Sequence, residues 1–255
     1  MEANVIDLCE KYRPRKFGDI LGNKVAVQCF KNSSLTGKIP SRVILHGETG
    51  SGKNTLADVY SKSITCENFQ GEPCGECDPC KTLEANYPYG SAISGVSLYD
   101  CTKIDERGLD EIINRYLGFH SLNKIDRNVF IWDEFHRITD RWKDKLLNPK
   151  SKRDIFIYLL IDLSVVPRAL QGRAIVLKTE RPEMGEIIPR LRQICELEGI
   201  IVKDGDALIT LAREADRLTR ECIKFLETSA VYGEPLTVNL VKKFFKHRRS
   251  IGNED

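Results

Sequence analysis

Long hydrophobic runs are absent from this sequence of 255 residues. No segment approaches the roughly 18 consecutive apolar residues that a membrane-spanning helix needs. The first thirty residues also lack the apolar run of a signal peptide. The sequence therefore argues against a membrane protein and against a secreted protein, and it predicts a cytoplasmic location with no membrane contact.

An excess of charge of one sign is absent as well. The 39 Lys and Arg residues nearly balance the 37 Asp and Glu residues, which leaves a net charge of +2. This balance excludes a uniformly basic surface, so any contact with nucleic acid must come from a local patch. Internal repeats and low-complexity tracts are also missing. What is present, 41% hydrophobic and 30% charged residues, is typical of a globular protein with one core and a smaller attached unit.

Short apolar segments alternate with helical patterns through about residue 180. Strands that alternate with helices predict a parallel sheet covered by helices on both faces, so the expected fold class is α/β. A helix is expected after the first strand and another at 109–117. The predicted strands are 43–46, 93–100, 128–134 and 154–164.

The C-terminal part of the sequence has helical periodicity instead. Three apolar stretches, which begin near Ile187, Asp206 and Leu236, predict a bundle of three helices. The proline and glycine of the segment TERPEMG mark the boundary between the two parts. We therefore expect one domain at 1–183 and a small helical domain at 184–255.

A glycine-rich loop lies between the first predicted strand and the helix that follows it. Its glycines let successive backbone N–H groups converge on a phosphate, and the N-terminus of the helix adds favourable partial charge. Lys53 at the end of the loop is placed to reach the β- and γ-phosphates. We therefore expect ATP to bind through the phosphate-binding loop, which consists of Gly47, Glu48, Thr49, Gly50, Ser51, Gly52 and Lys53.

The residue after Lys53 is unusual for such a loop. A Ser or Thr normally stands there so that its hydroxyl can bind Mg²⁺. Here the residue is Asn54, and Thr55 comes one position later. An amide oxygen can also bind Mg²⁺, but the Asn side chain is bulkier than a hydroxyl. The substitution therefore bears on hydrolysis more than on nucleotide binding.

The predicted strand at 128–134 ends in two acidic residues, Asp133 and Glu134. At the carboxyl edge of a parallel sheet, Asp133 would lie beside the metal ion and Glu134 could polarise the attacking water. Two acids at the end of a strand are by themselves no more than surface residues. Their position about eighty residues after a phosphate-binding loop favours the catalytic interpretation.

Four of the nine cysteines, Cys66, Cys74, Cys77 and Cys80, are clustered within fifteen residues. The short spacings allow two pairs of sulfurs to reach one tetrahedral ion, and zinc is the natural occupant. An iron–sulfur cluster and a redox CxxC pair are alternatives, but neither explains an insertion directly after the helix of a phosphate-binding loop. The other five cysteines are expected to be small core residues.

The order of these motifs resembles the gamma/tau and delta-prime subunits of bacterial clamp loaders, which belong to the AAA+ ATPases. The resemblance covers nearly the whole chain. It implies an AAA+ nucleotide-binding domain at 1–183 with a zinc module at 66–80, and a helical lid domain at 184–255. It rests on KYRPRKFGDILGN (11–23), the phosphate-binding loop, the four cysteines, DEFH (133–136), VPRALQGRA (166–174) and IPRLRQICELEGI (188–200).

The resemblance also implies roles for residues outside these motifs. In the family the KYRP segment lies against the adenine, which assigns Tyr12, Arg13 and Pro14 to that contact; an ordered N-terminal arm is the alternative. Arg173 corresponds to the arginine finger that enters the ATP site of a neighbouring subunit, unless it is simply solvated. Arg220 corresponds to the lid arginine that reaches the γ-phosphate, although a helix of this charge carries exposed arginines in any case.

Two departures from the family pattern bear on activity. Leu160 and Ile161 replace the polar residue that senses the γ-phosphate, and Asp162 is the nearest polar substitute. Together with Asn54, this change predicts slow or absent hydrolysis. Family members also continue into a C-terminal collar that builds the pentamer, so the chain is expected to be a truncated form or a shortened, phage-borne relative.

The expected function is that of an ATP-binding subunit of a DNA sliding-clamp loader in DNA replication. Its expected cofactors are ATP, Mg²⁺ and Zn²⁺. Its expected partners are other clamp-loader subunits, the sliding clamp and primer–template DNA, contacted through phosphates. Two alternatives stay open, namely a non-hydrolysing structural subunit that donates Arg173 and another AAA+ ATPase of replication or recombination.

Overall fold

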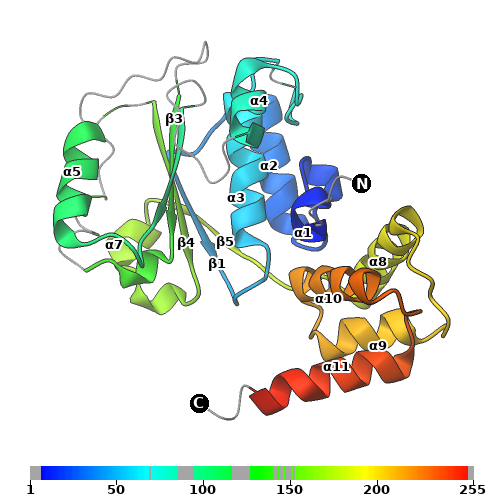
Figure 1. Ribbon diagram of the computed structural model, residues 1–255. Coiled ribbons are helices and arrows are strands. Elements are labelled where there is room, and N and C mark those ends of the chain that lie inside the picture. The colour runs from blue at the N-terminus through cyan, green and yellow to red at the C-terminus, as the bar shows by residue number, and fades with distance from the viewer. Residues whose placement is uncertain are drawn as a thin grey trace. The chain divides into compact units, whose positions relative to one another are not determined.

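The computed structural model divides the chain into two compact units (Figure 1). The α/β unit is Pro14–Glu180, and the helical unit combines Met1–Arg13 with Arg181–Asp255. This division differs from the expected boundary in that the N-terminal segment groups with the helical unit. The backbone N–H of Leu8, a buried residue, donates to Glu227 at 2.9 Å, which accounts for that grouping. The structure describes residues 7–68, 70–85, 95–116, 127–139, 143, 146, 151 and 153–251.

The α/β unit contains a parallel sheet of five strands in the order β2-β3-β4-β1-β5. Leu45 of β1 pairs with Leu159 of β4 on one side and with Leu177 of β5 on the other. Residues 93, 94 and 117, which belonged to predicted elements, lie outside the described residues. The strands are β1 (Arg42–His46), β2 (Val96–Asp100), β3 (Asn128–Asp133), β4 (Asp154–Leu160) and β5 (Ile175–Lys178).

Two of the strand predictions need correction. β5 was not predicted, because this four-residue edge strand buries only Leu177 and so lacks a core pattern. The strand predicted at 154–164 ends at Leu160, because Asp162 caps the short 3₁₀ helix η3 (Leu163–Val165) by accepting from the Ser164 N–H at 2.9 Å.

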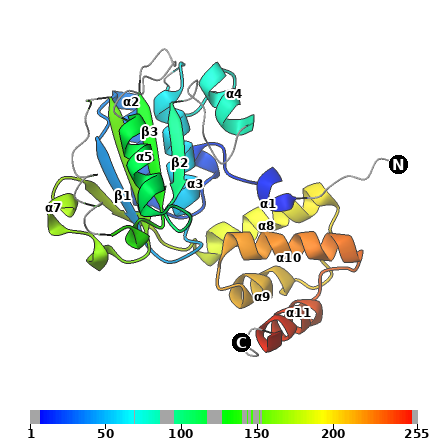
Figure 2. The same cartoon turned by 60° about the vertical axis from the view of Figure 1, so that its left-hand side comes forward.

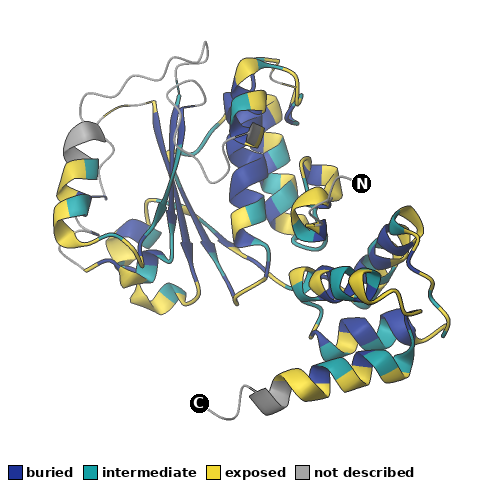
Figure 3. Cartoon of the chain, in the orientation of Figure 1, coloured by how far each residue is buried: buried dark blue, intermediate teal, exposed yellow. Residues whose placement is uncertain are grey.

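Helices cover both faces of the sheet, as the sequence predicted (Figures 1 and 2). Alternate strand residues point to opposite faces, so Val43 and Leu45 pack with Phe30 and Ile64 on one side, while Ile44 packs with Trp132 on the other. The three inner strands, β1, β3 and β4, are accordingly buried along most of their length, whereas the edge strands β2 and β5 each bury one residue (Figure 3). One face carries α2 (Lys24–Thr36), α3 (Lys53–Thr65) and α4 (Asp78–Ala85), and the other carries α5 (Glu106–Tyr116) and α7 (Arg168–Gln171).

The prediction of three helices in the C-terminal part was wrong. Among its described residues there are four, because the stretch that begins at Asp206 forms two helices. Asp216 and Arg217 have φ values of 50° and 58°, in the left-handed region, which ends the first of them. The four are α8 (Met184–Glu198), α9 (Ala207–Glu214), α10 (Thr219–Tyr232) and α11 (Val238–Ile251).

The helical unit has its own apolar core. Phe225 of α10 packs against Phe244 and Phe245 of α11, with ring centroids 4.9 and 5.8 Å apart. Ile187 and Leu191 of α8 and Leu208 and Leu211 of α9 are buried. Across the described part of the chain, no helix combines the length and the apolar character that crossing a membrane requires.

Candidate functional site

The phosphate-binding loop joins β1 to α3, and its glycines are required by its backbone. Gly47, Gly50 and Gly52 have φ values of 152°, 78° and 92°. The Gly47 N–H donates to the carbonyl of Leu160 on β4 at 3.2 Å. A Cβ atom at position 47 would lie only 2.4 Å from the carbonyl oxygen of Thr179. No larger residue therefore fits at position 47 without moving β5.

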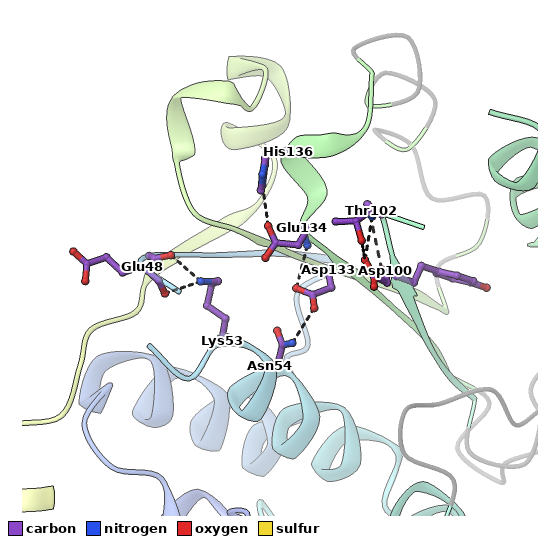
Figure 4. Close-up of polar contacts among 11 residues, drawn as sticks. Glu48, Lys53, Asn54, Asp100, Thr102, Asp133, Glu134 and His136 are labelled. Carbon is purple, nitrogen blue, oxygen red and sulfur yellow. Dashed lines mark hydrogen bonds and ion pairs between the residues drawn. The ribbon is translucent and has the colours of Figure 1, made fainter. Parts of the chain in front are cut away.

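Lys53 begins α3 and lies almost buried at the loop (Figure 4). Its Nζ donates to the carbonyl oxygens of Gly47 at 2.7 Å and Glu48 at 2.8 Å. Burial lowers the pKa of Lys53, while the nearby carboxylates of Glu134 and Asp133 act to raise it. The loop therefore presents a cation and the free N–H groups of a helix N-terminus together, which fits the phosphates of a nucleotide.

The other loop residues divide into an exposed tip and a buried base. Glu48, Thr49 and Gly50 are exposed at the tip, whereas Ser51 is buried below it. The Ser51 hydroxyl donates to the Glu48 carbonyl at 2.7 Å and lies 2.7 Å from the Thr179 hydroxyl. The tip is thus accessible to a ligand while its base is fixed to the end of β5.

Asn54 lies next to Asp133, at the edge where Mg²⁺ is expected (Figure 4). The Asn54 Nδ2 donates to one carboxylate oxygen of Asp133 at 2.9 Å, and the other oxygen accepts from the Glu134 N–H at 3.0 Å. An N–H donor cannot bind a metal ion. In this arrangement the Asn54 amide donates a hydrogen bond to Asp133 instead of offering a ligand to the metal ion, and Thr55 is the nearest hydroxyl in sequence.

Glu134 follows β3 with a left-handed backbone, φ 54°. This conformation is uncommon for a residue other than glycine and costs about 1–3 kcal/mol, and it often occurs at functional sites. His136, on the short 3₁₀ helix η2 (Phe135–Arg137), has its Nδ1 3.4 Å from a Glu134 oxygen. From the sequence alone His136 was assigned no role, and the structure adds this contact with Glu134.

At the end of β4, residues 160–162 provide no free polar side chain to sense the γ-phosphate. Leu160 is buried and Ile161 is 43% exposed. Asp162 directs its carboxylate to Ser164, whose backbone N–H and hydroxyl both donate to it. Asp162 is therefore committed to its own turn.

The residues assigned by resemblance lie on both units. Arg173 is exposed just after α7 in the α/β unit, and Arg220 is exposed in the first turn of α10 in the helical unit. Their roles at an ATP site stay predictions.

Tyr12 packs within the helical unit. Its hydroxyl donates to Glu198 of α8, and the guanidinium of Arg190 lies over its ring at 5.6 Å from the centroid. Burial and the contact with Glu198 raise the pKa of Tyr12 to about 12. Arg13 belongs to the same unit, and Pro14 begins the α/β unit. These contacts agree with an ordered N-terminal arm, and the adenine contact stays a prediction.

The four clustered cysteines converge between the end of α3 and the start of α4. Their sulfur atoms all lie within 4.8 Å of one another. The Cys74–Cys80 and Cys66–Cys77 sulfur distances are 4.0 and 3.9 Å. A tetrahedral zinc ion with Zn–S bonds of about 2.3 Å needs sulfurs about 3.8 Å apart. The four cysteines can therefore hold one metal ion.

The backbone around Cys74 favours its thiolate. Burial opposes ionisation, but the N–H groups of Cys77 and Glu76 both donate to the Cys74 sulfur at 3.3 Å. Together with sulfur contacts, these donors lower the pKa of Cys74 to about 6. Four convergent sulfurs exceed what a two-cysteine redox pair needs, and they suit a closed structural zinc site.

Comparisons with known proteins agree with this geometry. A family model described as DNA polymerase III, delta subunit matches residues 22–91. The DNA polymerase III subunit gamma/tau of Mycoplasma pneumoniae is 27% identical over 246 residues, which cover 93% of this chain and 35% of that protein. Protein STICHEL of Arabidopsis thaliana is 28% identical over 245 residues, which cover 92% of this chain and 19% of that protein. The chain thus spans about a third or less of these two curated relatives.

Solved structures show the fold. The RuvB Holliday junction branch migration motor of Thermotoga maritima superposes with a TM-score of 0.64 at 14% identity, covering 92% of this chain and 72% of that chain. The chain has the AAA+ fold, as predicted, and its resemblance to the gamma/tau subunits is confirmed over nearly its whole length.

Proposed function

We propose that the chain is an ATP-binding subunit of a DNA sliding-clamp loader that acts in DNA replication. One observation carries this proposal, namely the cysteine cluster set directly after α3 on an AAA+ fold. The similarity to gamma/tau subunits over 93% of the chain supports it. Neither the RuvB fold nor a phosphate-binding loop requires such a cluster.

The α/β unit supplies the groups that would hold the nucleotide. The backbone N–H groups of the phosphate-binding loop and the Lys53 ammonium bind phosphate oxygens. Asp133 is the carboxylate that Mg²⁺ would use, and Mg²⁺ supplies charge neutralisation of the phosphates when bound. Glu134 is the base that orients and polarises the attacking water. The four cysteines would hold zinc in a structural role, because four thiolates fill its tetrahedral coordination.

Hydrolysis by the chain alone is slow in this proposal. The Asn54 amide donates a hydrogen bond to the Asp133 carboxylate, and the apolar residues Leu160 and Ile161 stand at the sensor positions. An arginine finger must come from a neighbouring subunit, and such a residue is worth about 10³–10⁵ in rate. In this proposal ATP binding closes the contacts between neighbouring subunits. The proposed partners are these subunits, the clamp and the phosphates of primer–template DNA.

A second candidate is a structural subunit that does not hydrolyse ATP and donates Arg173 to its neighbour. The hydrogen bond from Asn54 to Asp133 favours this candidate, since it takes up the carboxylate that Mg²⁺ needs. An AAA+ ATPase of recombination fits the RuvB-like fold, but it leaves the cysteine cluster unexplained.

The test is ATP turnover by the chain alone and in mixtures with candidate loader subunits, with and without clamp and primed DNA. The proposal predicts slow turnover alone and an increase that depends on both partner subunits and primed DNA. If mixtures with the unchanged chain and with its Arg173→Ala variant show the same increase in ATP turnover, the proposal that Arg173 is an arginine finger would be contradicted. A turnover rate that stays the same with and without clamp and primed DNA, under every condition, would contradict the clamp-loader function.

A further inference from the structure

Asn23 has an unusual backbone and an unusual set of partners. It stands immediately before α2 with φ 54°, in the left-handed region that Asn tolerates better than most residues. Asn at the start of a helix normally caps it with its side chain. Here the side chain makes no such hydrogen bond, so its amide is available for contacts outside α2.

The amide of Asn23 joins two segments far apart in sequence. Its Nδ2 donates to the backbone carbonyl of Ser51 in the phosphate-binding loop at 3.0 Å. Its Oδ1 accepts from the backbone N–H of Glu180 at 2.8 Å. The NH₂ group of the Asn23 amide is thus hydrogen-bonded to the loop, and its oxygen is hydrogen-bonded to Glu180. Glu180 is the last residue of the α/β unit and directly precedes Arg181 of the helical unit.

A second contact runs in parallel. The Ser51 hydroxyl lies 2.7 Å from that of Thr179, and Thr179 is buried, with its N–H donating to the His46 carbonyl at 2.7 Å. Ser51 is therefore connected by its carbonyl and by its hydroxyl to two consecutive residues, Thr179 and Glu180. Any displacement of the loop at Ser51 moves the chain that leaves the sheet.

We propose that Asn23 is a positioning residue that transmits occupancy of the phosphate-binding loop to the segment leading into the helical unit. The inference rests on the proposed nucleotide binding. Binding fixes the loop backbone, Asn23 passes this constraint to Glu180 through one rigid amide, and the first residues of the helical unit are ordered as a result. Because Asn23 contacts the backbone of Ser51 and of Glu180, its role is to couple the loop to the segment that leads out of the α/β unit.

The variant Asn23→Asp separates coupling from folding. Aspartate keeps an acceptor for the Glu180 N–H and tolerates the left-handed backbone, but it places a carboxylate against the Ser51 carbonyl where a donor stood. Asn23→Gly removes both hydrogen bonds and accepts the positive φ without strain. Asn32→Asp is the matched control, because Asn32 lies exposed on α2, where its side chain accepts a hydrogen bond from Gln28 at 2.8 Å and its backbone carbonyl accepts one from the Thr36 hydroxyl.

The measurement is amide hydrogen exchange in the peptide that covers residues 176–190, with and without saturating ATP. In the unchanged chain and in Asn32→Asp, ATP should slow exchange at Glu180 and Arg181 by about fivefold or more, the factor that one net hydrogen bond represents. In Asn23→Asp and Asn23→Gly the ATP-dependent slowing should be lost, although calorimetry still detects ATP binding.

Equal ATP-dependent slowing in the Asn23 variants and the unchanged chain would overturn the inference while leaving nucleotide binding intact. Absence of ATP binding to the unchanged chain would instead overturn the proposed function, and the inference with it. Calorimetry on the unchanged chain distinguishes the two failures before any variant is compared.

Discussion

Replacing Gly47 by alanine should destabilise the α/β unit, because Thr179, the residue after β5, leaves no room for a side chain. The added Cβ would lie 2.4 Å from the Thr179 carbonyl oxygen, which is 1.0 Å short of the 3.4 Å at which ordinary contact begins. Thr179 cannot move that far without breaking its hydrogen bond to His46 and its contact with Ser51, both 2.7 Å long. Overpacking and the loss of these contacts predict a loss of about 3 kcal/mol.

Denaturant unfolding followed by circular dichroism measures this loss, and calorimetry measures ATP affinity in parallel. Gly18→Ala and Gly172→Ala are matched controls in the same unit, since an added Cβ meets nothing within 4 Å at Gly18 and only an ordinary 3.5 Å contact at Gly172. Both should change stability by less than about 1 kcal/mol. If Gly47→Ala unfolds at the same denaturant concentration as these controls and binds ATP normally, the packing of the loop against β5 is not as described.

Three further predictions concern the metal site, the magnesium edge and the N-terminal arm. Protein purified without chelator should contain one zinc per chain, and Cys80→Ser should lower zinc affinity by more than about tenfold because one of four ligands is lost; elemental analysis that finds no zinc would remove the assignment. Asn54→Thr should raise ATP turnover in the presence of partner subunits by about tenfold, since it removes the hydrogen bond to Asp133 and restores a hydroxyl, and a gain of about 1.5 kcal/mol, the low end for one hydrogen bond to a charged group, corresponds to this factor; unchanged turnover would show that Asn54 does not limit the rate. Because the folded pKa of Tyr12 is raised from 10.0 to about 12, its stabilisation is complete below pH 10 and is lost as the pH rises towards 12; the stability difference between the unchanged chain and Tyr12→Phe should shrink across that interval, and a constant difference would contradict the contact with Glu198.

The local parts of the site were predictable from sequence. The phosphate-binding loop and the cysteine cluster depend on residue types at short fixed spacings, and in the structure the loop joins β1 to α3 while the cysteine sulfurs converge. The alternation of strands and helices likewise predicted the parallel sheet, because buried parallel strands are apolar along their length.

Features that depend on tertiary contacts were not predictable. β5 is an edge strand with one buried residue, so its identity comes from pairing with β1 and not from its own pattern. The break between α9 and α10 contains neither proline nor glycine, since the left-handed residues are Asp216 and Arg217. Asn23 and Thr179 act on the loop across 28 and 128 residues of sequence, and no local motif reports such contacts.

The central claim is that the phosphate-binding loop binds ATP through Lys53, and calorimetric titration of ATP into the unchanged chain and Lys53→Ala tests it most directly. Lys38→Ala, an exposed lysine of the same unit, is the control, and circular dichroism verifies that all three are folded. The account predicts binding without any partner and a loss of affinity of more than about tenfold for Lys53→Ala alone, because a charge-assisted contact to phosphate disappears. Equal ATP affinity in all three proteins, or no binding to the unchanged chain, would contradict it.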